Sequence, residues 1–409
     1  MSIRFKGPAV ATLALAMLTS CDRGVTDPTP ANDPAALSLS LTDGRTGPPV
    51  TLEWQQTARD LVAQRNMSPL AAARLFAAAN MAAMRAVETA DAASKAPAGH
   101  HNGGGFGPGG RSRFQARRGA VAGASAQVLA WFVPTAAPDL DAIVARQGHA
   151  RPSRVHPDYT RGVEIGRAAG DEVIAHVMND GFTAPWTGTV PVGDGLWTPA
   201  ALPPAGVMLG QVTPWFMTSG DQFRPVPPPA YLSPAFNADI DEVFAITSNL
   251  TADQRAIALG WAYGAGTYTP VGYWNELAAK YVAADGLDEA EAAKVFGLMS
   301  AAVFDAVIAA FEAKYHYWTL RPHQANPAIP TAFAVPNYPA YPSGHGNVSG
   351  ASARVLAHFF PQRASELTAL VDEAAMSRIY AGIHYFFDMT AARSMSEDIA
   401  DHVIESAEP

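Results

Sequence analysis

The chain has 409 residues, of which 48% are hydrophobic and only 16% are charged. A chain of this length and composition can bury one large core or two smaller ones, which excludes general disorder. The net charge of −9 argues against the broad basic surface that nucleic-acid binding requires, so no nucleic acid is expected as a partner. An anionic ligand would therefore have to be bound by a local cluster of cations.

The N-terminus is typical of a bacterial lipoprotein signal. Arg4 and Lys6 precede a short apolar run, 8–17, which is too short to span a bilayer as a helix. The Leu-Thr-Ser-Cys that follows resembles a lipobox, in which the peptide is cleaved before a cysteine that becomes lipidated, here Cys21. We expect residues 1–20 to be a signal peptide and the protein to be lipid-anchored in the cell envelope, on the periplasmic face. The alternative is an ordinary secretory signal with an incidental cysteine.

Residues 21–50 are rich in Pro, Asp, Thr and Ser and lack a hydrophobic period, which predicts a flexible tether. The pattern of residues 51–409 predicts one all-α domain of long, Ala-rich amphipathic helices, and two stacked four-helix bundles would fit its length. Ser68 and Pro69 are typical of an N-cap and a first helical residue. Helices are predicted at 52–66, 69–93, 119–132, 139–147, 157–179, 236–247, 251–264, 271–284, 287–318, 344–359, 363–385 and 390–405.

Two segments between these helices lack periodicity. Residues 99–110 are mostly Gly and His and predict a mobile loop, with a metal site at His100 and His101 as the less favoured alternative. Residues 181–234 are dense in Pro, Gly and aromatic residues and are too apolar for a disordered linker. We expect this second segment to wrap over the helices as ordered irregular structure.

Lys314 and Arg321 are the first of three groups of residues that could bind an oxyanion. Their spacing of seven residues predicts that both side chains lie on one face near the end of the helix that contains them. Pro322 disfavours helical geometry at the preceding residue, so Arg321 is expected where the chain leaves the helix. Taken alone, the pair fits a solvated helix end that stops at a proline.

The second group is Pro342-Ser343-Gly344-His345. Ser343 is a natural N-cap for the helix that follows, and a helix N-terminus offers unpaired N–H groups to an anion. Gly344 lets the backbone approach an anion closely, and His345 could transfer a proton beside it. A capped helix after a proline-rich loop explains the same four residues.

The third group places Arg378, His384 and Asp388 on one predicted helix. His384 and Asp388 are four residues apart, so the carboxylate can bond one ring nitrogen and leave the other free as a base, nucleophile or metal ligand. A lone helical histidine is usually structural. The neighbouring aspartate and arginine make that explanation weaker here.

The three groups complete the motifs Lys-x6-Arg-Pro, Pro-Ser-Gly-His and Ser-Arg-x5-His-x3-Asp within a motif core at 311–390. The chain is thereby identified as a member of the superfamily that joins vanadium-dependent haloperoxidases to type-2 phosphatidic acid phosphatases. The resemblance implies a helical domain of that type and vanadate or phosphate as the bound anion. The implied anion-binding residues are Lys314, Arg321, Ser343, Gly344, Arg378 and His384.

The resemblance also implies the catalytic roles. His384 would be the axial vanadium ligand, His345 the acid–base residue, and Lys314 would polarise the bound peroxide. Hydrogen peroxide would then oxidise a halide to hypohalous acid, which a small organic acceptor consumes. In a phosphatase, His384 would instead attack the phosphorus of a phosphate monoester, His345 would protonate the leaving alcohol, and no cofactor would be needed. A non-catalytic binding lipoprotein is a third hypothesis.

Residues beside the motifs favour the haloperoxidase. Gly382, two residues before His384, Tyr338-Pro-Ala-Tyr341, and the segment 261–275 all resemble haloperoxidases. Tyr338 and Phe311 are expected to line the halide or substrate pocket. These positions resemble those of bacterial relatives that use iodide or bromide, and the resemblance implies bromide or iodide in preference to chloride. The fungal chloroperoxidase has an aspartate to pair with the motif arginine where Gly264 aligns, so the partner of Arg378 is open.

Overall fold

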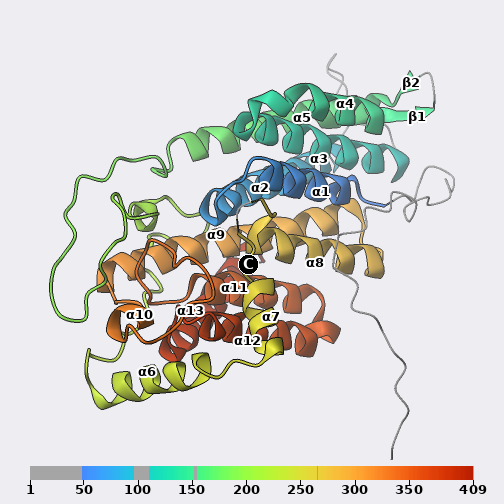
Figure 1. Ribbon diagram of the computed structural model, residues 1–409. Helices are drawn as coiled ribbons and strands as arrows, with labels where there is room; N and C mark the ends of the chain where they lie inside the picture. The colour runs from blue at the N-terminus through green and yellow to red at the C-terminus, as the bar shows by residue number, and fades with distance from the viewer. Residues whose placement is uncertain (1–47, 96–109, 152–153, 265, 409) are drawn as a thin grey trace, which may run out of the picture. The chain divides into compact units, whose positions relative to one another are not determined.

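The computed structural model describes residues 48–95, 110–151, 154–264 and 266–408 (Figure 1). The predicted signal peptide, Cys21, nearly all of the tether, His100 and His101 lie outside the described residues. The helices are α1 (Val50–Gln64), α2 (Pro69–Lys95), α3 (Gly110–Phe132), α4 (Ala137–Gly148), α5 (Pro157–Met178), α6 (Pro234–Thr247), α7 (Ala252–Gly260), α8 (Thr269–Asp285), α9 (Glu289–Tyr317), α10 (Pro322–Ala325), α11 (Gly344–Phe359), α12 (Ala364–Tyr380) and α13 (Phe386–Ala407).

The all-α prediction is confirmed for this part of the chain. The described strands are a short antiparallel hairpin of β1 (His149–Arg151) and β2 (Arg154–Val155), which was not predicted. Ser68 accepts a hydrogen bond from the Ala71 N–H at 3.2 Å, as expected of the residue that precedes α2. The start of α3 was predicted at residue 119 but lies at Gly110. Arg113 and Arg117 there pair with Asp91 of α2, and these ion pairs support helical turns that have no apolar period.

The helices between residues 50 and 408 form two groups that meet along α2 and α9 (Figure 1). In one group α2, α3 and α5 pack together, with α1 and α4 beside them. In the other, α9, α11, α12 and α13 pack together, with α7 on α12. This arrangement agrees with two stacked bundles, and it buries α9 along almost its whole length.

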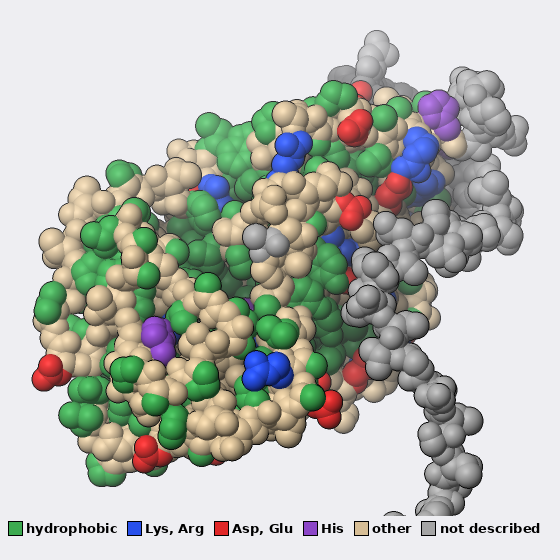
Figure 2. Space-filling view, in the orientation of Figure 1, with side chains coloured by type: hydrophobic (Ala, Val, Ile, Leu, Met, Phe, Trp, Pro, Cys, Tyr) green, Lys and Arg blue, Asp and Glu red, His purple; other side chains and the backbone are tan. Residues whose placement is uncertain are grey.

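Two described helices, α2 and α9, are long and apolar enough to cross a membrane by length and composition. The most apolar windows of these two helices are 83% and 94% buried inside the protein. Buried core helices of a large helical domain meet the same criteria of length and composition. The charged side chains are sparse on the face shown in Figure 2, in keeping with the low charge content of the chain.

The segment 181–234 is ordered irregular structure, as predicted, with one 3₁₀ turn at Leu209–Gln211. It is anchored to the middle of α9 by Asp305, a fully buried carboxylate. Asp305 accepts backbone N–H groups from Trp215, Phe216 and Met217 at 2.8, 2.9 and 3.2 Å. Burial raises the pKa of Asp305 to about 6 in spite of these three donors.

The two helices that begin beside the motifs, α11 and α13, approach closely because α11 has glycines where they meet. A Cβ at Gly346 would lie 2.8 Å from the Cβ of Ala392, and one at Gly350 would overlap Oγ of Ser396. The N-terminus of α13 is capped by a residue from another helix, far away in the sequence. Asp239 of α6 accepts the N–H groups of residues 386 and 387 at 2.8 and 3.0 Å.

Candidate active site

Lys314 and Arg321 lie on either side of the end of α9. The helix ends at Tyr317 because Trp318 adopts a left-handed conformation with φ of 50°. Arg321 is extended and precedes the first residue of α10, Pro322. The prediction that Pro322 takes Arg321 out of helical geometry is confirmed. The prediction that both cations lie on one helical face was wrong, because three residues of turn separate Arg321 from the helix.

The ammonium group of Lys314 is fully buried and bonded to the loop that leads to Ser343. Its Nζ donates to the carbonyl oxygens of Pro339, Ala340 and Pro342 at 2.9, 2.7 and 2.5 Å. Burial, and then the nearby charge of Arg321, lower the pKa of Lys314. Since an ammonium has three donors, Lys314 can reach an anion only by releasing one of these carbonyls.

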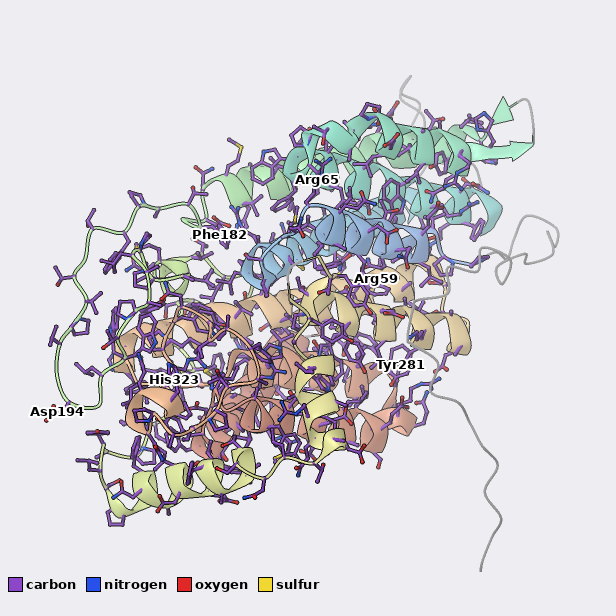
Figure 3. The ribbon with its side chains drawn as sticks, in the orientation of Figure 1. Arg59, Arg65, Phe182, Asp194, Tyr281 and His323 are labelled. Carbon is purple, nitrogen blue, oxygen red and sulfur yellow. The ribbon has the colours of Figure 1, made fainter. Side chains whose placement is uncertain are left out.

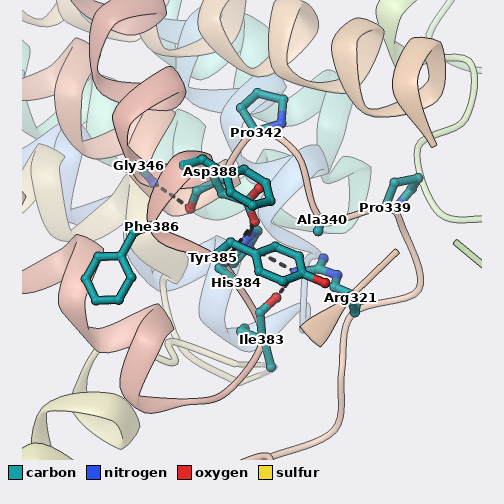
Figure 4. A network of polar contacts seen from close by, with 12 residues as sticks. Arg321, Pro339, Ala340, Pro342, Gly346, Ile383, His384, Tyr385, Phe386 and Asp388 are labelled. Carbon is teal, nitrogen blue, oxygen red and sulfur yellow. Dashed lines mark hydrogen bonds and ion pairs between the residues drawn. The ribbon is translucent and has the colours of Figure 1, made fainter. Parts of the chain in front are cut away.

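The Arg321 guanidinium lies between the same loop and the turn that carries His384 (Figure 4). Its Nε donates to the carbonyl of Tyr338 at 3.1 Å, and its Nη1 donates to the carbonyl of Ile383 at 2.7 Å. Nη1 also lies 3.0 Å from Nε2 of His384. Nη2 is buried and has no hydrogen-bond partner among the described residues. A buried guanidinium nitrogen without a partner is costly, which makes Nη2 a ready donor to an anion.

Ser343 is the N-cap of α11, as predicted. Its Oγ accepts the N–H of Gly346 at 3.2 Å, and its side chain is fully buried. The first N–H groups of α11, those of Gly344 and His345, have no carbonyl within the helix to which they could donate. A Cβ placed on Gly344 would meet nothing within 4 Å, so there is open space at this helix end. The end of α11 therefore has room, N–H donors and a hydroxyl for an oxyanion.

His345 is half-buried and is held by the end of α7. Its Nε2 lies 3.0 Å from the carbonyl oxygen of Trp261. A carbonyl can only accept, so Nε2 carries the proton and Nδ1 has the free lone pair. Burial, and then the positive charge of Arg378, lower the pKa of His345. The ring is therefore neutral near pH 7 and able to accept a proton.

Arg378, near the end of α12, is buried without an acidic partner among the described residues. Its Nη2 donates to the carbonyl of Ala258 at 2.9 Å, its Nε donates to Ser377 Oγ at 2.9 Å, and its guanidinium lies 5.2 Å from the ring of Phe333. A Cβ at Gly264 would meet nothing within 4 Å. A carbonyl, a hydroxyl and an aromatic face thus hold Arg378, and its full positive charge remains available.

His384 and Asp388 do not share a helix with Arg378, so that prediction was wrong. α12 ends at Tyr380, and Gly382 turns the chain with φ of 70°. His384 lies in this turn and Asp388 in the first turn of α13. Their predicted contact is confirmed nonetheless, because Nδ1 of His384 lies 2.6 Å from Oδ2 of Asp388. Oδ2 also accepts the N–H of Tyr385 at 3.2 Å.

Tyr338 covers the cations on one side. Its ring centroid is 5.1 Å from Nζ of Lys314 and 5.1 Å from Cζ of Arg321. Phe311 of α9 contacts the same ring edge to face, with the centroids 5.0 Å apart. The aromatic pair expected from the sequence therefore borders the cations.

These residues form one group, the cationic cage, defined as Lys314, Arg321, Ser343, Gly344, Arg378 and His384. The three cations are each at most 1% exposed, and the acidic side chain that acts on both Lys314 and Arg321 is Asp388. Three buried positive charges against one carboxylate, with an unpartnered Nη2, favour an anionic ligand. Apart from one histidine lone pair, the donors are N–H and O–H groups, which suit the oxygens of vanadate or phosphate and not a bare divalent cation.

Several groups that hold the cage in place could not be predicted from the sequence. The carbonyls of Ala258, Trp261 and the 339–342 loop carry no residue signature, because any residue can supply a carbonyl. Trp261 lies within the segment 261–275, which resembles haloperoxidases. That resemblance is the sequence signal that points to this residue. Nothing in the sequence links Asp239 to the start of α13.

The PAP2 superfamily model matches residues 293–397, which include all of the cage. Residues 293–397 are therefore recognised as a PAP2 superfamily segment. No curated protein sequence matches the chain significantly.

Solved structures of vanadium-dependent peroxidases share the fold of this chain. A bacterial vanadium-dependent iodoperoxidase is 23% identical with a TM-score of 0.70, and the match covers 87% of this chain and 96% of that one. The holo form of a bacterial vanadium-dependent chloroperoxidase is 18% identical with a TM-score of 0.67, covering 90% and 99%. Its apo form is 17% identical with a TM-score of 0.66, covering 84% and 94%. The likeness extends to helices far outside the PAP2 segment.

Proposed function

We propose that this protein is a vanadium-dependent haloperoxidase that uses hydrogen peroxide to oxidise bromide or iodide to hypohalous acid. The observation that carries the proposal is the cationic cage around His384, whose Nε2 is free of a proton. The cage suits phosphate equally well. Halide oxidation is favoured because the structural likeness to the iodoperoxidase covers 87% of the chain, including the helices before the PAP2 segment.

His384 would hold the vanadium through Nε2, since Asp388 fixes the proton on Nδ1. Nη2 of Arg321, the Arg378 guanidinium, Ser343 Oγ and the first N–H groups of α11 would bind the oxygens. When bound, vanadate supplies a Lewis acid that activates hydrogen peroxide without a change in oxidation state. These donors lie in a buried site, where fixed donors act more strongly on developing negative charge than they would in water.

His345 is the residue placed to move protons. Its Nδ1 has a lone pair because Nε2 donates to the Trp261 carbonyl, and its lowered pKa keeps the ring neutral. A neutral imidazole of this kind can take a proton from hydrogen peroxide and later give it to the peroxide oxygen that is not transferred to the halide. With one further proton from solvent, that oxygen leaves as water, so hydrogen peroxide, halide and one proton give hypohalous acid and water. Lys314 would add positive charge beside the reacting oxygen when it exchanges one loop carbonyl.

Tyr338 and Phe311 border the cage with aromatic surface. A weakly hydrated anion loses less solvation energy than chloride when it enters such surroundings. This supports bromide or iodide as the halide. We also propose, from the N-terminal sequence alone, that lipid on Cys21 holds the enzyme at the periplasmic side of the cell envelope.

The deciding experiment compares two activities of one purified protein. Halogenation of monochlorodimedone is assayed with orthovanadate, hydrogen peroxide and each halide in turn, and hydrolysis of p-nitrophenyl phosphate is assayed without vanadate. We expect vanadate-dependent halogenation with bromide or iodide. Vanadate-independent hydrolysis with no halogenation would replace the proposal with a phosphatase that uses His384 as nucleophile. If the protein showed neither activity, the remaining hypothesis would be a non-catalytic binding protein.

A further inference from the structure

Tyr338 also lines a cavity of about 510 Å³ that is separate in composition from the cage. Its walls come from three stretches: residues 68–71 at the start of α2, residues 182–186, and residues 203–209. The volume is within the range of sites for small organic molecules. The two later stretches belong to the irregular segment 181–234. This segment contributes no residue to the cationic cage.

The lining of this cavity is uncharged and mainly apolar, with Ser68 and Tyr338 as the residues that carry hydroxyl groups. None of its lining residues carries a charge, and the large contributors are Leu70, Phe182, Trp186, Met208 and Leu209. Such a surface gives no favourable partner to a phosphate, a sulfate or an amino acid. It suits a flat or compact apolar molecule, and the aromatic side chains favour an aromatic ring.

The walls are held in place by contacts outside the cavity. Asp180 pairs with Arg74 of α2 at 2.7 Å and accepts the N–H of Phe182 at 2.8 Å. The Arg74 guanidinium lies 4.5 Å from the Phe182 ring, which Figure 3 labels near α2. On the opposite stretch, Gly206 has φ of 68°, and a Cβ there would lie 2.6 Å from the Phe311 ring. The cavity is therefore preformed and does not depend on a ligand to open it.

Tyr338 joins this cavity to the cage. Tyr338 lines the cavity. The centroid of its ring also lies 5.1 Å from both Nζ of Lys314 and Cζ of Arg321. A molecule in the cavity would thus be one aromatic ring away from the groups that hold the anion. Hypohalous acid formed at the cage would therefore arise close to this molecule.

We propose that the cavity binds the organic acceptor and that this acceptor is a small, uncharged aromatic compound. The proposal rests on the proposed haloperoxidase function for its chemistry. Hypobromous acid would transfer its bromine to a ring carbon, the C–H bond would break, and the proton and hydroxide would leave as water. Bromine is reduced in this step and the ring is oxidised, so no further oxidant is needed.

Binding can be tested without any catalysis. The fluorescent probe N-phenyl-1-naphthylamine is titrated into the full chain without vanadate, peroxide or halide. We expect saturable binding to wild type and at least tenfold weaker binding to Ala71→Trp, which fills the cavity from α2. Ala184→Trp lines the same cavity from an exposed position in the irregular segment, and serves if the α2 variant does not fold.

The matched control is Ala238→Trp, an exposed position on α6, which should bind the probe like wild type. No saturable binding by wild type, or equal binding by both cavity variants, would overturn the proposal. A second measurement uses 1-naphthol as acceptor with vanadate, peroxide and bromide, where each cavity variant should raise KM at least tenfold.

Oxidation of iodide to triiodide by wild type needs no organic acceptor and tests the haloperoxidase function separately. Probe binding that the cavity variants lose, without triiodide formation, would uphold the cavity and refute the enzyme. Triiodide formation without probe binding would uphold the haloperoxidase function and refute the proposed acceptor cavity.

Discussion

Nη1 of Arg321 lies 3.0 Å from Nε2 of His384, on the side of the imidazole ring opposite Asp388. The carboxylate fixes the proton on Nδ1, so Nε2 has a lone pair that accepts from the guanidinium. Burial, and then the charge of Arg321, lower the pKa of His384. The ring is thus held neutral, which is the form that a metal ligand or a nucleophile must have. Nη1 of Arg321 donates to this lone pair, which the vanadium or phosphorus atom of a bound anion would take instead.

His384→Ala should abolish vanadate binding, because it removes the lone pair at the centre of the cage. Isothermal titration with orthovanadate measures this directly, without reliance on turnover. The matched control is His316→Ala, which replaces an exposed histidine in the last turn of α9 and should bind like wild type. Wild-type affinity in the His384 variant would show that the ligand binds elsewhere.

Asp388→Asn should weaken vanadate binding by about 10- to 100-fold, the usual effect of losing the group that orients a ligating histidine. The amide keeps the shape of the carboxylate but no longer fixes the Nδ1 proton by charge. The same titration checks it, with Asp372→Asn as the control, since Asp372 forms an exposed ion pair with Arg393. An unchanged Kd would mean that Asp388 serves only to cap α13.

Gly382→Ala should both destabilise the protein and impair the site. Its φ of 70° disfavours any Cβ, and a Cβ there would overlap the carbonyl oxygen of Pro330. We expect a loss of about 2–4 kcal/mol in the free energy of unfolding, together with weaker vanadate binding through displacement of His384. Gly286→Ala is the control: its φ is 67° but a Cβ would meet nothing within 4 Å, so it should cost only about 1 kcal/mol.

Denaturant unfolding measures both glycine variants at one pH. Equal losses for the two would show that backbone strain alone matters, and that the Pro330 carbonyl moves aside.

The parts of the site that could be predicted are those set by spacing along the chain. Ser343 as N-cap, the exit of Arg321 before Pro322, and the contact of His384 with Asp388 depend on neighbours within four residues. The motif spacings also led to the superfamily and hence to the fold. Local chemistry was enough for all of these.

The parts that could not be predicted depend on tertiary contacts. The helix predicted over 363–385 ends at Tyr380 because the chain must turn under the Pro330 carbonyl, and one glycine in an apolar run does not show this. Arg378 is held by Ala258 and Phe333, which are 120 and 45 residues away in the sequence. Because Arg378 is held by a backbone carbonyl and an aromatic ring, there is no acidic residue in the sequence that would identify its partner.

Asp305 predicts how stability should change with pH at a position remote from the cage. Burial raises its pKa to about 6, above the ordinary value of 3.8, so the folded state binds more protons than the unfolded state between these values. The free energy of unfolding should therefore rise as pH falls from 7 to 4, by about 2 kcal/mol from this group at 1.36 kcal/mol per pKa unit. Asp305→Asn lacks the titrating group and is the reference.

The measurement is denaturant unfolding of wild type and Asp305→Asn at pH 7, 6, 5 and 4. The difference in unfolding free energy, wild type minus variant, should increase as the pH is lowered, because other titrating groups contribute equally to both proteins. The three backbone donors at residues 215–217 act in the opposite direction, since they favour the charged carboxylate. If the difference instead shrinks below pH 6, these donors outweigh burial, and Asp305 holds the irregular segment as a stable carboxylate.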